Sequence, residues 1–287
     1  MNQNFFTDIH IQKVLKKSKK PTHHYNNKFG TFLIYPLFKD FTIIYACQPL
    51  NKKSTQFIKK LARRHNSIYT VIETLNPVQE FKHKSFKEFI PRATRQISLS
   101  QPLEEIYKQM HPKGRYNAKL AQKKALTVSK DLTAKQFYQL LQNTSVRDNF
   151  SINSKDYYTQ LFKLIPNHQL HKYAVYLDKQ LIAAAIVIDH KDTAYYLYGA
   201  SDHKHRQLMA PYLIQHQAIK DAKQRKLKIY DFLGISPYSP HPLDKVSEFK
   251  RKFGGQIVHY QQNQIIIHKP ILFGLLKIRK FLKNLKN

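Results

Sequence analysis

The chain has 287 residues, of which 42% are hydrophobic and 13% aromatic, so it can bury a core and is not a disordered basic tail. Its 49 lysine and arginine residues against 18 acidic residues give a net charge of +31. Such a charge favours a polyanionic partner: nucleic acid, an anionic membrane or a phosphorylated substrate. A proteome biased towards lysine and asparagine would give the same charge, so this alternative stays open.

The cysteine and histidine content argues against disulfides and metal centres. The single cysteine, Cys47, excludes an internal disulfide and favours a reducing compartment. No HExxH or Cys–His spacing is present, and the nearest pattern, the HKH at 203–205, is interpreted as a solvated loop. We therefore expect neither a metal nor a bound cofactor.

The apolar segments are too short for a membrane span. The longest uncharged apolar run, Leu181–Ile188, falls far short of the ~20 residues that a spanning helix needs. The N-terminal residues show no basic segment followed by an apolar stretch, so no secretory signal is predicted. We expect a cytoplasmic protein.

Residues 1–97 are predicted to form a small α/β unit. Its first 28 residues are polar, basic and poorly patterned, and the stretch KKSKKPTHHYNNK (16–28) indicates an exposed connection. β-Branched and aromatic runs then predict strands, and apolar residues at helical spacing behind a Ser/Thr cap predict one helix. The expected strands are 30–37, 41–50 and 67–75, and the expected helix is 54–65.

Residues 98–268 alternate between helical and strand patterns. A helix, a Pro-Gly break at 112–114, a basic helix and a strand from Leu126 come first, followed by two further helices. Short polar turns then separate three apolar runs, which predicts an antiparallel meander. The remaining order is a helix, a strand, a short helix and two strands: 208–225, 228–237, 248–255, 256–261 and 264–269.

The tail, 269–287, predicts a basic amphipathic helix. Ile271, Leu275, Ile278, Leu282 and Leu285 follow spacings of four and three, and six basic residues but no acidic ones surround them. Such a helix can lie on the inner face of an anionic membrane or pack back on the body of the protein, and the sequence does not choose between the two.

The order of elements in 98–268 matches the GNAT acyltransferase fold. Acyl-CoA users of that fold place a glycine-rich turn before the central helix, because the backbone must approach a pyrophosphate closely. The equivalent stretch here, 203–214, contains no glycine and has Ala210-Pro211 at the turn. The sequence therefore predicts a GNAT-like protein with a donor other than CoA.

Four motifs in the same order make the chain resemble the FemABX family of aminoacyltransferases. They are GRYNAKLAQKKALTVS (114–129), YLYGAS (196–201), APYLIQHQAIKDAKQRKLKIYDFLGI (210–235) and EFKRKFGG (248–255). The resemblance implies an α/β (α+β) fold with a mixed, mostly antiparallel sheet flanked by helices in two GNAT-like domains. We expect a truncated N-terminal domain at 1–97, a C-terminal domain at 98–268 and the basic helix at 269–287.

The resemblance also implies an activity. Members of the family move an amino acid from aminoacyl-tRNA to a peptide amine of a peptidoglycan precursor, and so build cell-wall cross-bridges. The expected partners are thus aminoacyl-tRNA and a nucleotide-linked or lipid-linked precursor, and the expected state is a monomer. The alternatives are an acyl-CoA-dependent N-acyltransferase and a non-enzymatic RNA- or membrane-binding protein on the same fold.

The resemblance assigns roles to particular residues. Phe249 and Lys250 match the Phe-Lys pair of the family, whose lysine stabilises charge on the reacting ester carbonyl. Tyr157 and Tyr198 match tyrosines that contact the acceptor. The family usually has Arg where this chain has Asn153, and Lys155 is the candidate to replace its charge.

Three further residues complete the expected site. Arg115 and Lys119 match the basic helix of the family and could face phosphates. Asp231 is expected to fix the end of its strand, and a role as general base is a weaker alternative.

Overall fold

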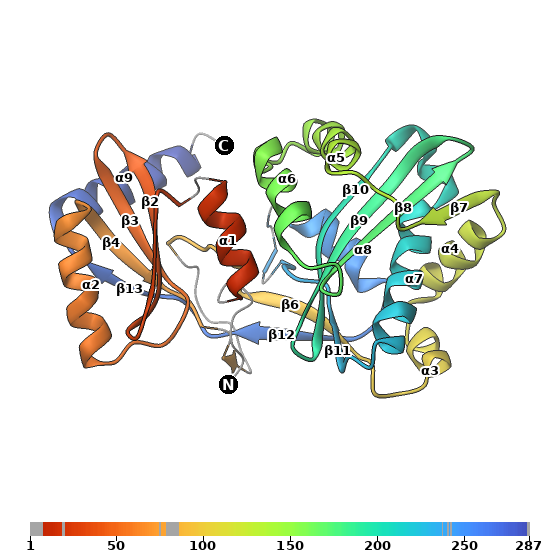
Figure 1. Cartoon of the computed structure of the whole chain (residues 1–287), viewed down its shortest axis with the longest axis horizontal. Helices are drawn as coiled ribbons and strands as arrows, with labels where there is room; N and C mark the ends of the chain where they lie inside the picture. The colour runs from red at the N-terminus through yellow and green to blue at the C-terminus, as the bar shows by residue number, and fades with distance from the viewer. Residues whose placement is uncertain are drawn as a thin grey trace. The chain divides into compact units, whose positions relative to one another are not determined.

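The computed structural model describes residues 8–18, 21–74, 76–78, 86–236, 238–239, 241 and 243–285 (Figure 1). They form two compact units: Met1–Ile90 with Tyr260–Asn287 is unit 1, and Pro91–His259 is unit 2. None of the helices in these ranges combines the length and apolar character needed to cross a membrane. The same residues contain no group of three or more His, Cys, Asp or Glu that could hold a metal ion.

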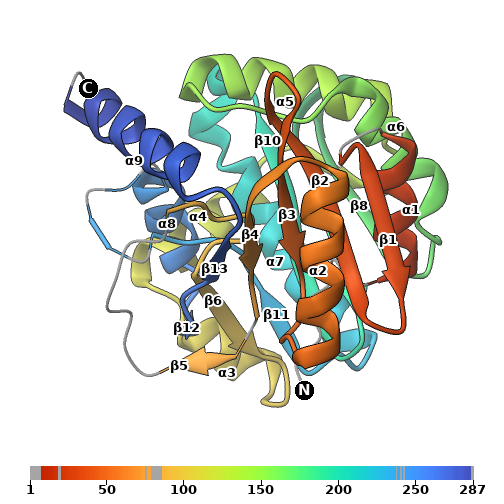
Figure 2. The ribbon, with the colours of Figure 1, turned by 90° about the vertical axis from the view of Figure 1, so that its left-hand side faces the viewer.

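Unit 1 is built on a five-stranded sheet in the order β1-β2-β3-β4-β13. Strands β3 and β4 are parallel and are joined by helix α2, the crossover that a parallel neighbour requires, while the other pairs are antiparallel. Figure 2 shows α2 in front of this sheet and running roughly along its strands. The elements are α1 (Ile9–Lys17), β1 (His23–Asn27), β2 (Gly30–Phe38), β3 (Phe41–Ala46), α2 (Lys52–Arg64), β4 (Ser67–Ile72), β5 (Pro77–Val78), β13 (Gln264–Ile267) and α9 (Pro270–Leu285).

The exposed connection expected at 16–28 is partly wrong, because the end of α1 and the whole of β1 lie there. Asp8 caps α1 by accepting from the His10 and Ile11 backbone N–H groups, and the helix buries an apolar face that includes Val14. Strand β1 is an edge strand of polar, mostly exposed residues, so no alternation of apolar residues marks it in the sequence.

Unit 2 has the longer run of elements. They are β6 (Ala93–Ser98), α3 (Leu103–Lys108), α4 (Pro112–Gln122), β7 (Leu126–Ser129), α5 (Ala134–Asp148), α6 (Lys155–Leu164), β8 (Leu170–Leu177), β9 (Gln180–His190), β10 (Thr193–Ser201), the 3₁₀ helix η2 (His203–Leu208), α7 (Ala210–Gln224), β11 (Ile229–Asp231), α8 (Asp244–Arg251) and β12 (Gln256–Tyr260). The predicted loop at 203–205 is therefore helical. The predicted break at 112–114 falls earlier, because Pro112 opens α4, where its missing N–H costs no hydrogen bond.

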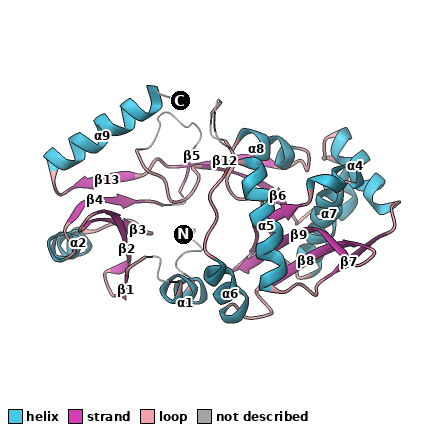
Figure 3. Cartoon of the chain, turned by 90° about the horizontal axis from the view of Figure 1, so that it is seen from above, coloured by secondary structure: helices cyan, strands magenta, loops and turns pink. Residues whose placement is uncertain are grey.

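The strands of unit 2 follow the order β12-β6-β11-β10-β9-β8-β7. Helices α5 and α6 cover one face of this sheet, and α4 and α7 the other (Figure 3). Strands β10 and β11 are the parallel pair, but they pair only from Thr193–Ile229 to Tyr195–Asp231. Beyond those residues β10 continues to Ser201, whereas the segment that follows β11 leaves the sheet. The two segments therefore separate in the middle of the unit.

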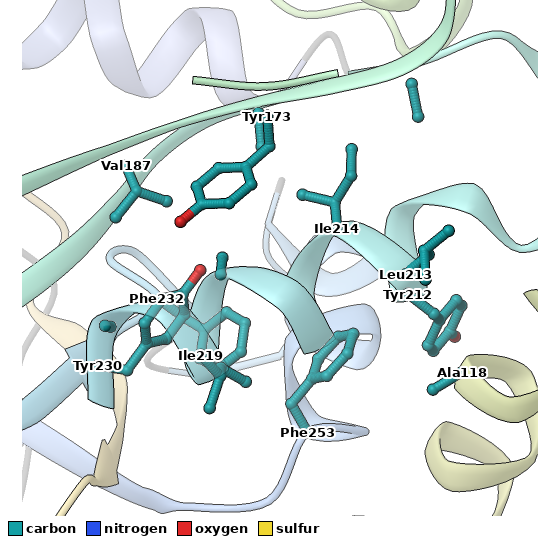
Figure 4. Packing of buried hydrophobic residues seen from close by; sticks show 14 of the residues in the cluster. Ala118, Tyr173, Val187, Tyr212, Leu213, Ile214, Ile219, Tyr230, Phe232 and Phe253 are labelled. Carbon is teal, nitrogen blue, oxygen red and sulfur yellow. The ribbon is translucent and has the colours of Figure 1, made fainter. Parts of the chain in front are cut away.

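The core of unit 2 lies between the sheet and α7. It is rich in aromatic residues: the Phe232 and Phe253 rings stack with centroids 5.3 Å apart, and Tyr230 is fully buried beside them (Figure 4). Tyr230 donates its hydroxyl to Gln215 Oε1 at 2.8 Å, so its burial leaves no polar group unsatisfied. This packing fixes the end of β11 against the segment that follows α8.

The boundaries of the compact units differ from the expected domains. Unit 2 begins at Pro91 rather than 98, and residues 260–287 belong to unit 1. Strand β13 was expected in the C-terminal domain, but it pairs antiparallel with β4 in the sheet of unit 1. The residues of a short apolar strand do not specify which strand it pairs with, so the pairing of β13 with β4 cannot be predicted from the sequence.

Candidate active site

Lys250 is a buried lysine on α8, and its side chain lies against the end of β11. The ammonium Nζ donates to the Leu233 and Gly234 carbonyls at 3.0 and 2.7 Å, and the residue as a whole is only 7% exposed. The ring of Tyr196 lies 5.9 Å from Nζ. Two carbonyls and an aromatic face therefore hold the charged end where β10 and β11 separate.

Burial gives Lys250 an unusual acidity. It lowers the pKa of Lys250 to about 7, although the charge of Asp231 acts in the opposite direction. Burial also raises the pKa of Asp231, while its hydrogen bonds and the Lys250 charge partly offset this. A lysine that titrates near neutral pH can both hold and release a proton, which is a property of catalytic lysines.

Asp231 is fixed by three donors at the end of β11. Thr94 Oγ1 donates to one carboxylate oxygen, Gln96 Nε2 donates to the other at 2.8 Å, and the Leu233 N–H donates at 2.6 Å. These bonds agree with the expected role of fixing the strand end. The segment that follows β11 is tightly constrained as well. Leu233 adopts φ +50°, and Gly234 has room only for hydrogen because Pro91 packs against it.

The two predicted tyrosines lie together on the other face of the sheet. Tyr198 donates its hydroxyl to that of Tyr157 at 3.0 Å, and Asn153 Nδ2 donates to the Tyr198 hydroxyl at 3.3 Å. Burial raises the pKa of both phenols, so each stays neutral at physiological pH. Asn153, which the sequence marks only as a departure from the family, is thus a member of this cluster.

A β-bulge separates the two tyrosine environments. Residues two apart on a regular strand face the same side, but the register of β10 against β9 shifts between Tyr196 and Tyr198. Tyr196 packs against Phe232 on the α7 side, and Tyr198 packs against Tyr158 of α6. The bulge therefore lets one strand present a tyrosine to Lys250 and another to the α6 cluster.

The N-terminus of α7 offers few free N–H groups. Met209 precedes it at φ +54°, Pro211 has no N–H, and the Tyr212 N–H is bonded to the Met209 carbonyl at 2.9 Å. A cavity of about 120 Å³ lies here, and Phe249 lines it while packing its ring 5.3 Å from that of Tyr212. The expectation that this turn does not cradle a pyrophosphate stays a prediction.

A second and larger cavity, of about 670 Å³, is cationic. Arg95 and Arg251 lie on its wall with His111, and the described lining contains no carboxylate side chain. Arg95 Nη1 donates to the Gly254 and Gly255 carbonyls at 3.0 and 2.8 Å, which fixes its guanidinium. Burial, and after it the charge of Arg251, lower the pKa of Arg95. No pattern in the sequence marks this cavity, although Arg251 directly follows Lys250.

The remaining predicted residues lie away from these clusters. Arg115 of α4 donates Nη1 to the Lys108 carbonyl at 2.9 Å and to that of Met110, so it stabilises the C-terminal end of α3. Lys119 is exposed on α4, and Lys155 is exposed at the first residue of α6. Their contacts with a substrate stay predictions.

The separating parallel strands and the flanking helices define a GNAT-like acyltransferase fold. The model of the FemAB family matches residues 49–175 and 168–280. The chain therefore belongs to the FemAB family. Membership in this family, whose members are transferases, supports a function of the peptidoglycan cross-bridge aminoacyltransferase kind.

Solved structures support the same fold. The crystal structure of FemX superposes with a TM-score of 0.75 at 17% identity, covering 95% of this chain and 94% of that one. The C-terminal domain of a protein assigned as a lysylphosphatidylglycerol synthetase from Agrobacterium fabrum gives 0.58 at 9% identity, covering 96% and 94%. A tandem GNAT protein from the clavulanic acid pathway gives 0.51 at 10%, covering 83% and 79%. Among curated proteins, none matches the sequence.

Proposed function

We propose that the chain transfers an aminoacyl group from aminoacyl-tRNA to a side-chain amine of a peptidoglycan precursor in the cytoplasm. The observation that carries this proposal is Lys250, a buried lysine held by two carbonyls where β10 and β11 separate. An activated ester needs little more than positioning and a charge beside its carbonyl. The site supplies that charge from a fixed position.

The reaction balances without a cofactor. The acceptor amine attacks the ester carbonyl carbon, a C–N bond forms, and the carbonyl electron pair moves onto oxygen. An ammonium group has three N–H donors, and the two carbonyls use two of those of Lys250. The third N–H donates to this oxyanion and stabilises it. The carbonyl then re-forms, the C–O bond breaks, and the proton lost by the amine ends on the departing ribose oxygen.

The tyrosine cluster is the proposed contact for the acceptor. Tyr157 and Tyr198 are neutral phenols joined by a hydrogen bond and positioned by Asn153. Neutral hydroxyls and an amide suit a peptide or sugar better than a phosphate, which a cation would bind more strongly. Lys155, exposed one residue before Asp156 in the first turn of α6, is the proposed contact for any phosphate of the acceptor.

The RNA donor is proposed to use the cationic cavity of unit 2. Arg95 is fixed by two carbonyls, and Arg251 is exposed on the same wall. Guanidinium groups bind phosphate oxygens in two-pronged geometry, and the absence of carboxylates on the described lining favours an anion. Because Arg251 follows Lys250 on α8, RNA held here would lie next to the segment that carries the lysine.

A transfer assay tests the proposed function. Purified protein would be given a mixture of labelled aminoacyl-tRNAs together with nucleotide-linked and lipid-linked precursors. We expect label on a precursor amine, in an amide bond that resists mild base, and no transfer from acyl-CoA. Label on neither precursor would disprove the proposed reaction.

Arg251→Ala should weaken RNA binding more at low salt than at high salt. The loss of one phosphate contact should reduce the slope of log affinity against log salt by about one. The measurement is a binding titration with tRNA over a series of salt concentrations. Lys220→Ala, an exposed lysine of α7, is the control that removes the same charge elsewhere in unit 2. Equal slopes for the two variants would contradict a contact in this cavity.

A further inference from the structure

Helix α9 presents an apolar stripe that no described residue covers. Ile271, Leu275, Ile278, Phe281 and Leu282 are between 53% and 83% exposed. The opposite side of the helix holds it to unit 1: Phe273 is buried, with its ring 5.2 Å from that of Tyr69 and 5.0 Å from that of Phe86. Figure 3 shows α9 beside β13 and β4. The helix is thus packed on one face and left apolar and exposed on the other.

Four of these five exposed residues form a narrow stripe. At about 100° per residue, Ile271, Leu275, Ile278 and Leu282 fall within roughly 60° of the helix circumference. Single exposed apolar residues are normal on protein surfaces, but a continuous row of this kind marks an interaction surface.

Basic residues flank this stripe. By the same geometry Arg279 lies about 70° from its centre on one side. Lys277 lies about 130° away on the other side, with its Nζ 5.4 Å from the centroid of the Phe273 ring. Both are exposed, and Lys280, which is also exposed, donates to the Phe86 carbonyl. The segment 269–287 contains six basic residues and no acidic one. Long basic side chains beside an apolar stripe can reach anionic headgroups while the stripe enters the acyl layer.

We propose that α9 lies flat on the surface of a bilayer that contains anionic lipid, with the stripe of Ile271, Leu275, Ile278 and Leu282 inserted. The basic residues of α9 favour a membrane over a second copy of this chain as the binding partner of the stripe. A second copy would bring two sets of like charges together, whereas anionic headgroups neutralise them. The proposal concerns unit 1 only, and it does not depend on the transfer reaction.

Vesicle sedimentation tests this proposal. Wild-type protein should bind vesicles of phosphatidylcholine and phosphatidylglycerol in equal parts, bind them less at high salt, and bind vesicles of phosphatidylcholine alone much more weakly. Ile278→Glu should weaken binding to the mixed vesicles by about tenfold or more, because it places a charge in the inserted stripe. Point substitution is preferable to deletion of the helix, since deletion would also uncover Tyr69.

Val146→Glu is the matched control. Val146 is 79% exposed on α5, so this variant has the same added charge on an exposed helical position of unit 2, and it should bind vesicles like the wild type. Equal loss in both variants, or wild-type binding by Ile278→Glu, would overturn the proposal. So would a concentration-dependent dimer, seen by analytical ultracentrifugation, that Ile278→Glu abolishes in a protein without affinity for the mixed vesicles.

Discussion

Lys250→Met should reduce the rate of aminoacyl transfer by about 100- to 1,000-fold, the usual loss when one preorganised oxyanion donor is removed. Methionine fills a similar volume and can keep the apolar stem packed, but it cannot donate to the Leu233 and Gly234 carbonyls or to a substrate. The measurement is the single-turnover transfer rate at saturating substrates. A folded Lys250→Met protein that transfers at the wild-type rate would exclude Lys250 as this donor.

Lys245→Met is the control for this substitution, because Lys245 is an exposed lysine of the same helix and should keep the full rate. Stability against pH gives a second check. Burial lowers the pKa of Lys250 to about 7, so between this pH and the ordinary lysine pKa of about 10.4 the unfolded chain binds more protons than the folded one. The free energy of unfolding should therefore rise with pH by up to about 1.4 kcal/mol per unit from this group. Lys250→Met should lack that rise.

Gly255→Ala should destabilise unit 2 by about 2–5 kcal/mol. Gly255 has φ +74°, where an L-residue costs about 1–2 kcal/mol. A Cβ there would also lie 2.3 Å from the Gln96 carbonyl oxygen of β6, and forced overpacking costs about 1–3 kcal/mol more. Such a loss is a large part of the stability of an ordinary domain. The measurement is urea unfolding followed by far-ultraviolet circular dichroism.

Gly274→Ala is the control for this change, since it introduces the same methyl group. Gly274 lies within α9, and a Cβ there would meet no atom within 4 Å. Alanine should therefore stabilise the helix by about 0.5–1 kcal/mol through its higher helix propensity. If the two variants unfold at the same urea concentration, the proposed clash of Gly255 with β6 is wrong.

Much of the fold could be predicted because its signals are local. The meander of β8, β9 and β10 and the amphipathic helix α7 follow directly from apolar periodicity, and they were enough to indicate the GNAT-like fold. Polar edge strand β1 and the pairing of β13 with β4 were not predicted. Register and partner choice depend on residues far away in the chain, which a local pattern does not contain.

The candidate site was only partly visible in the sequence. Resemblance selected Lys250, Tyr157 and Tyr198, but the two carbonyls that hold Lys250 come from a strand exit whose shape depends on Leu233 at φ +50°. Leucine rarely adopts this conformation, so no propensity predicts it. The bulge that separates the environments of Tyr196 and Tyr198 is likewise not marked by any local sequence pattern.

The pairing of β13 with β4 has a consequence for synthesis and folding. Unit 2, residues 91–259, lies within the sequence of unit 1, and the sheet of unit 1 needs residues 264–267. During translation the nascent chain therefore presents every residue of unit 2 before β4 can gain its second neighbour. Until then one edge of β4 stays unpaired, and unpaired strand edges promote misassociation. Completion of unit 1 is thus a late, long-range closure, and it should be the slow step of folding.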